Sequence, residues 1–156
     1  MRKYSVLMML ALISMLLIGL QLSAMPTATP AIEAEVNIHP EVFNLNQRGV
    51  ITAHVSNLTK EGTSYDVEDV DVSTIMLYHQ NAFVAEPLRA TVADNTLIIK
   101  FDATTVAGYV WSVIYHMGII PPIWPQADYT MEFTVLGTLF GGEEFAGKDT
   151  IKIIAP

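Results

Sequence analysis

The chain has 156 residues, of which 51% are hydrophobic, and its 16 acidic and 8 basic residues give a net charge of −8. This length fits one domain, and the acidic balance argues against a nucleic-acid partner, because phosphate binding needs clustered Lys and Arg. There is no cysteine, which excludes disulfides, thiol chemistry and Cys-based metal sites. We expect no cofactor.

The first 24 residues have the layout of a secretory signal peptide. Arg2 and Lys3 form a short positive region, residues 5–20 are uncharged and mostly Leu, Met and Ile, and cleavage is expected after Ala24. A retained signal anchor is the alternative, because about 16 apolar residues are slightly short for a membrane span. We therefore expect a secreted or cell-surface protein that contacts a membrane only through an uncleaved N-terminus. Residues 25–31 are expected to form a linker.

A two-residue period of apolar and polar side chains predicts seven short strands in the rest of the chain. Pro87 marks the fourth as an edge strand, residues 57–65 read as a polar loop, and Gly141-Gly142 predicts a tight hairpin. The expected strands are residues 33–38, 49–56, 72–78, 85–92, 96–101, 129–136 and 148–154.

One segment has a helical period instead. Asp102 is a good N-cap, apolar residues recur at helical spacing from Val106 to Met117, and the prolines within residues 118–125 end the helix. The helix is apolar nearly all round, so it either closes an end of the β domain or exposes a patch to a partner, a copy of itself or a membrane. The partner-contact candidates are Trp111, Tyr115, Ile119, Ile120 and Trp124.

These elements predict an all-β fold over residues 32–156, an immunoglobulin-like two-layer sandwich of about seven strands with one inserted short helix.

Several stretches carry a resemblance to a known kind of domain. The most specific begins at Tyr65 and reads Tyr-Asp-Val-Glu-Asp-Val-Asp-Val-Ser-Thr-Ile-Met-Leu; others begin at Asn44, Leu97 and Phe133. Over residues 38–154 the chain resembles a β-sandwich module of secreted and cell-surface archaeal and bacterial proteins. The resemblance implies an extracellular accessory or structural domain without catalytic residues. Residues 86–95 depart from it, because they lack the Asp- and Gly-rich loop often present there, and residues 106–125 are longer and more apolar.

A calcium site is the first chemical candidate. Asp66, Glu68, Asp69 and Asp71 form the densest acidic cluster, and calcium binds six to eight oxygens. Their spacing does not match an EF-hand loop, so a solvated loop leading into a strand is the competing interpretation.

The other patterns argue against an enzyme. The histidines at positions 39, 54, 79 and 116 fall in different elements without a metal-binding motif, no serine lies in a Gly-x-Ser-x-Gly elbow, and Glu143 and Glu144 point to opposite faces if they lie on a strand. Asn57-Leu58-Thr59 is an N-glycosylation pattern.

Three functions stay open. The first is a non-enzymatic structural or interaction module, acting in adhesion or surface architecture and binding a protein or itself. The second is a filament subunit that polymerises by strand addition through residues 32–38. The third is a calcium- or carbohydrate-binding module, with Trp111, Tyr115 or Trp124 stacking on sugar rings.

Overall fold

The computed structural model describes residues 31–118 and 129–154, and in this part of the chain ten strands form one curled sheet with a single α-helix. The sheet order is β6-β5-β9-β10-β1-β3-β8-β7, with β2 paired to β10 and β4 paired to β3. The strands are β1 Ile32–His39, β2 Val42–Asn44, β3 Val50–Lys60, β4 Thr63–Tyr65, β5 Val70–His79, β6 Ala82–Ala85, β7 Pro87–Ala93, β8 Thr96–Asp102, β9 Tyr129–Leu139 and β10 Glu144–Ile154.

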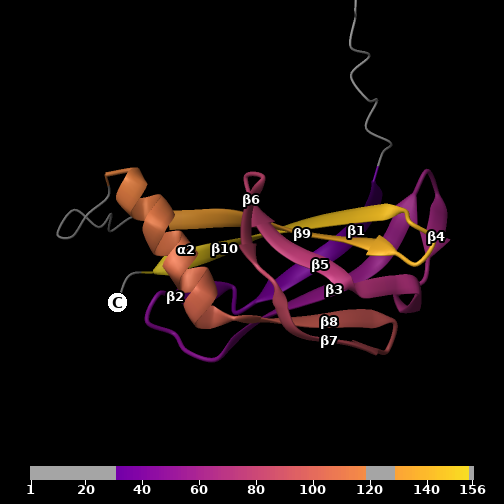
Figure 1. Cartoon of the computed structure of the whole chain (residues 1–156), viewed down its shortest axis with the longest axis horizontal. Helices are drawn as coiled ribbons and strands as arrows, with labels where there is room; N and C mark the ends of the chain where they lie inside the picture. The colour runs from indigo at the N-terminus through magenta and orange to yellow at the C-terminus, as the bar shows by residue number, and fades with distance from the viewer. Residues whose placement is uncertain (1–30, 119–128, 155–156) are drawn as a thin grey trace, which may run out of the picture.

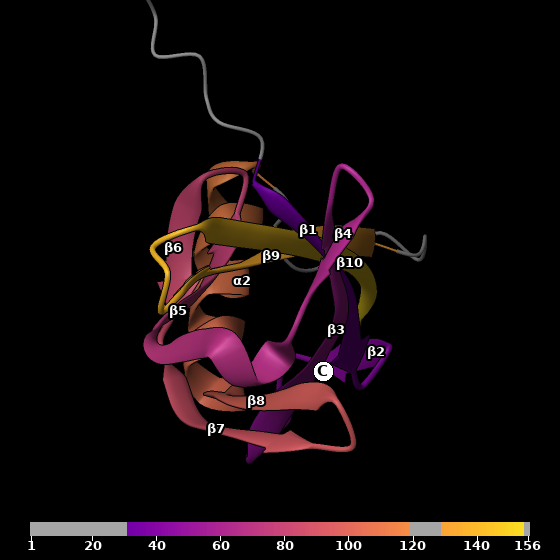
Figure 2. The same cartoon turned by 90° about the vertical axis from the view of Figure 1, so that its right-hand side faces the viewer.

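The curl of the sheet encloses the core. Figure 2 looks along it and shows the strands arranged around the interior. Alternate residues of the long strands point inward, so that β3 buries Ile51, Ala53 and Val55, and β9 buries Met131 and Phe133. A single hydrophobic cluster results, with the intervening residues on the outer face.

Helix α2, Ala103–His116, lies across the end of the sheet opposite the β3–β4 hairpin (Figures 1 and 2). Asp102 is its N-cap, as predicted, and accepts a hydrogen bond from the Thr105 amide. Val106, Val110 and Ile114 are buried against the core. The helix therefore closes one end of the curled sheet.

All seven expected strands are present, and β7 is an edge strand as Pro87 predicted. The polar loop expected over residues 57–65 is wrong: β3 continues to Lys60 and pairs with β4 across a turn at Glu61 and Gly62. Both turn residues have positive φ, 50° and 82°, as a tight hairpin turn requires.

The first strand joins the two halves of the sheet. β1 runs parallel to β10 at Ile32 and Glu33 and antiparallel to β3 along most of its length. A Cβ added at Gly147 of β10 would collide with the side chain of Val36 and the carbonyl of Ala34. The close approach of β1 to β10 therefore requires glycine at this position.

We predict that Gly147→Ala lowers the free energy of unfolding by about 1–3 kcal/mol, as overpacking a tight contact does. Gly108→Ala is the matched control, because Gly108 lies in α2 with open space around it. That change should raise stability by roughly 0.5–1 kcal/mol. Chemical denaturation of both variants measures the difference, and equal effects would contradict the close approach.

Candidate functional site

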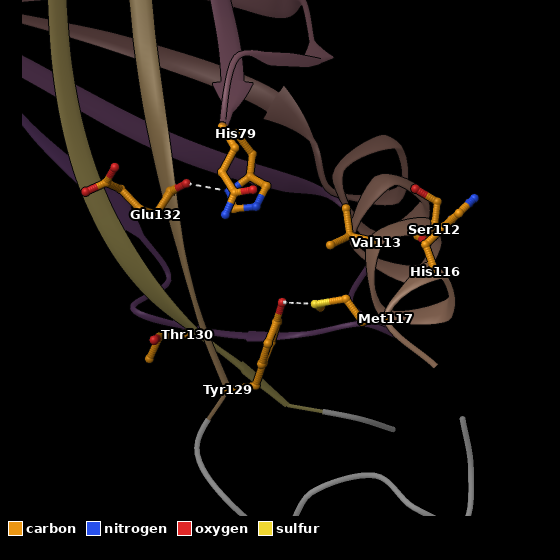
Figure 3. Close-up of a pocket in the computed structure, with 9 residues that line it drawn as sticks. His79, Ser112, Val113, His116, Met117, Tyr129, Thr130 and Glu132 are labelled. Atoms are coloured by element: carbon orange, nitrogen blue, oxygen red, sulfur yellow. Dashed lines mark hydrogen bonds between the residues drawn. The ribbon is translucent and has the colours of Figure 1, made fainter. Parts of the chain in front are cut away.

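A cavity of about 470 Å³ lies between the C-terminal part of α2 and the start of β9 (Figure 3). The helix forms one wall and the ends of β5 and β9 form the other. Its lining residues are His79, Gln80, Ser112, Val113, His116, Met117, Tyr129, Thr130 and Glu132.

His79 is the buried polar residue of this cavity, with 6% of its surface exposed. Its ring lies 5.9 Å from the rings of both Tyr109 and Phe133. Nδ1 is 2.8 Å from the backbone oxygen of Glu132, and because a carbonyl only accepts, Nδ1 donates in this bond. In the neutral imidazole Nε2 is then an acceptor, available to a ligand that donates a hydrogen bond.

Three other polar side chains of the cavity have local partners. Ser112 Oγ donates to the Tyr109 carbonyl at 2.7 Å, and His116 Nδ1 bonds the Ser112 carbonyl at 2.7 Å. Figure 3 shows the His116 ring pointing away from His79. Tyr129 Oη contacts Met117 Sδ at 3.9 Å. These groups can contact a small polar ligand, but the serine and histidines described here do not form a nucleophile–base pair.

Burial affects the acid–base behaviour of two tyrosines near the cavity. Burial raises the pKa of Tyr129 above its ordinary value. Burial also raises the pKa of Tyr109, and the nearby charge of ionised Tyr129 adds to the increase. Both phenols therefore stay neutral near pH 7 and act as hydrogen-bonding groups.

Two of the four calcium candidates accept local hydrogen bonds. Asp66 accepts from the Glu68 amide at the start of a short 3-10 helix, Val67–Asp69, and Asp71 accepts from the amide and hydroxyl of Ser73. Among the described residues, no three His, Asp or Glu side chains are grouped to hold a metal ion.

The glycosylation candidate Asn57 lies within β3, where its backbone has positive φ and its side-chain amide donates to Glu35 at 2.6 Å.

The partner-contact candidates separate into different environments. Trp111 is half-buried and packs against the core, whereas Tyr115 is 70% exposed. Ile119, Ile120 and Trp124 lie outside the described residues, as does the expected signal peptide. No helix in residues 31–118 and 129–154 is long and apolar enough to cross a membrane.

A second feature is an apolar patch on the outer face of β5, β6 and β9, which sequence reasoning missed. It consists of Met76, Tyr78, Phe83 and Leu136, and we call it the Tyr78 face. The rings of Tyr78 and Phe83 are 6.2 Å apart and edge to face, and Phe83 is 50% exposed. Tyr78 Oη contacts Met76 Sδ at 3.4 Å.

Two shallow depressions adjoin the Tyr78 face. One of about 320 Å³ and one of about 190 Å³ are both lined by Tyr78 and Leu136. A surface ion pair between Lys148 and Glu132, at 2.9 Å, borders the larger one. The surface is therefore hollowed and apolar at its centre and charged at its edge.

The chain matches no protein-family model, no curated protein and no solved structure.

Helix α2, which forms one wall of the cavity, begins at its N-cap Asp102. The Thr105 hydroxyl and amide donate to Asp102 and lower the pKa of its carboxyl below its ordinary value. A carboxyl whose pKa is lower in the folded state stabilises the fold above its unfolded pKa, and this contribution disappears as the pH falls through the folded value.

We predict that Asp102→Ala lowers the melting temperature at pH 6 and that its difference from wild type shrinks toward pH 2. Thermal melts monitored by circular dichroism across this range measure the effect. Glu86→Ala, at an exposed position, is the control and should show no such convergence. A constant difference at all pH values would show that the charge of Asp102 does not contribute.

Proposed function

We propose that the protein is a non-enzymatic, extracellular structural or interaction module that contacts a protein partner through the Tyr78 face. The observation that carries the proposal is the grouping of partly exposed Met76, Tyr78, Phe83 and Leu136 on the outside of a strongly acidic domain. Aromatic residues and Met are enriched in the centres of protein interfaces, and exposed apolar patches indicate interaction sites.

Further observations support parts of this proposal. The signal-like residues 1–24 support export. The curled sheet around one core is compatible with the immunoglobulin-like sandwich that we propose for the fold. The local bonds of Ser112, His79 and His116 support a non-catalytic role for the cavity.

Filament formation is a second candidate, supported by the free edge of β7. This strand pairs only with β8 among the described strands, and Leu88 is 63% exposed. Insertion of residues 32–38 into a neighbour is less well supported, because β1 lies in the middle of its own sheet with Ile32 and Ile38 buried. Sugar stacking has support only at Tyr115 among the described candidates, because Trp111 packs against the core.

Site-specific photo-crosslinking in the cells that make the protein tests the proposal. Benzoylphenylalanine at position 78 should give a covalent adduct with another polypeptide chain, identified by mass spectrometry. The same probe at the exposed position Ser64 of β4 is the matched control and should give at most a trace. Equal adducts at both positions, or none at position 78, would contradict a docking role for the Tyr78 face.

A further inference from the structure

The outer face of β7, β8, β3 and β1 collects basic side chains that are distant in sequence. Arg89 lies opposite Lys100, Lys100 lies opposite Thr52, and Thr52 lies opposite His39. His54 lies beside this row, with its ring 5.4 Å from that of His39. We call this surface the basic face, because it carries two cations and two imidazoles on an acidic protein.

The cations of the basic face have no acidic partner in the part of the chain that the structure describes. The salt bridge found there joins Lys148 to Glu132, and no described carboxylate lies within 4.0 Å of Arg89 or Lys100. Like charges directly opposite each other on paired strands are destabilising. An anionic group from outside the domain would remove this repulsion.

The carboxylates at the ends of the basic face are already hydrogen-bonded. Asp102 lies two residues beyond Lys100 and caps α2. Glu35 lies four residues before His39 in β1 and accepts from the Asn57 side-chain amide. An anion from outside the domain is therefore better placed than Asp102 or Glu35 to neutralise Arg89 and Lys100.

The Tyr78 face has an acidic row at one end. Asp71 of β5 lies opposite Thr138 of β9, and Thr138 lies opposite Glu144 of β10. The short helix that carries Glu68 and Asp69 is joined to the same end, because the Phe140 amide donates to the Asp69 carbonyl at 2.8 Å.

The acidic row and the basic row have matching dimensions. Each is a charged residue, a threonine and a second ionisable residue on three neighbouring antiparallel strands: Asp71-Thr138-Glu144 and Lys100-Thr52-His39. With strands about 4.8 Å apart, the outer positions of both rows are about 10 Å apart.

An exposed or half-buried apolar residue lies beside the central threonine of each row. Leu136 lies two residues from Thr138 in β9, and Val50, 39% exposed, lies two residues from Thr52 in β3. Both offsets are about 7 Å along the strand. When Thr138 lies over Thr52 with Leu136 on the Val50 side, these two apolar residues face each other.

We propose that the occupant of the Tyr78 face is a second copy of this chain, which docks through its basic face. The inference rests on the proposed function, and it names the partner and the contacts. Asp71 and Glu144 of one copy face the basic row, Lys100-Thr52-His39, of the next copy. The apolar centre of the Tyr78 face excludes water from the contact. Because the two surfaces are different, a docked pair still has one Tyr78 face and one basic face free, and association continues head to tail.

Light scattering and sedimentation of residues 25–156, which contain every described element, test the inference across a concentration series. At 50 mM NaCl the mean mass should rise at least twofold above the monomer. At 500 mM NaCl it should fall toward the monomer, because salt shortens the range of the charge interactions.

Charge-reversed variants make the test specific. The double variant Arg89→Glu/Lys100→Glu has two acidic surfaces, and the double variant Asp71→Lys/Glu144→Lys has two basic ones. Each variant alone should associate at least about tenfold more weakly than the wild type, because it loses close charge pairs across the interface. A 1:1 mixture of the two should restore assembly. Arg48→Glu/Lys60→Glu has the same net charge as the first variant and should assemble like the wild type.

Circular dichroism of each variant checks folding. Asp71 also bonds Ser73, so Glu144→Lys alone replaces the acidic double variant if the latter does not fold. A wild-type chain that stays monomeric, or a mixture that does not assemble, would overturn the inference.

The crosslinking experiment separates the two proposals. A monomeric chain with a Tyr78 adduct to a different protein overturns only the second-copy proposal, and a monomeric chain without an adduct overturns both. Binding of a polyanion to Arg89 and Lys100 in a monomeric chain would assign the basic face to a different class of partner.

Discussion

The fold depends on the contact between the first strand and the last. β1 is the strand that links β10 to β3, and so it connects the two halves of the curled sheet. It pairs with β10 only at Ile32 and Glu33 and then diverges toward β3. Where the two strands separate, the carboxylate of Asp149 accepts the Ile38 amide at 2.6 Å, which replaces the missing ladder bond. Gly147 makes the approach possible, and β2 then pairs again with the end of β10.

Much of this architecture could be predicted from the sequence because it depends on local patterns. The strands direct alternate residues into one core, so a period of two is visible in the sequence. Asp102 followed by an apolar pattern at helical spacing is a local helix signal. The β3–β4 hairpin was missed because its residues are mostly exposed, which leaves Leu58 as its main buried position. Its turn depends on backbone geometry at Glu61, a residue type that gives no strong turn signal.

The candidate sites were harder to predict because they depend on contacts between distant elements. The inward direction of His79 could be read from its alternation with Ile75 and Leu77, but the cavity also needs α2 to lie beside β9. The basic row, Lys100-Thr52-His39, exists only because β8, β3 and β1 pair in one particular register, and hydrophobic alternation alone does not specify that register. The four histidines lie in four different elements, as the sequence predicts, and only the fold shows that His39 and His54 are in ring contact and that His79 and His116 line one cavity.

The place of β1 also decides between two ways in which copies of this chain could associate. Adding β1 to the sheet edge of a neighbour would withdraw Ile32, Val36 and Ile38 from the core of its own copy, and burying each such side chain is worth about 1.5–3 kcal/mol. Their sum is a large share of the roughly 5–15 kcal/mol that stabilises a typical domain. Contact between the outer faces leaves β1, Gly147 and Asp149 undisturbed. The same alternation that directs apolar residues inward leaves the charged rows outside, where a neighbour reaches them without any strand leaving its sheet.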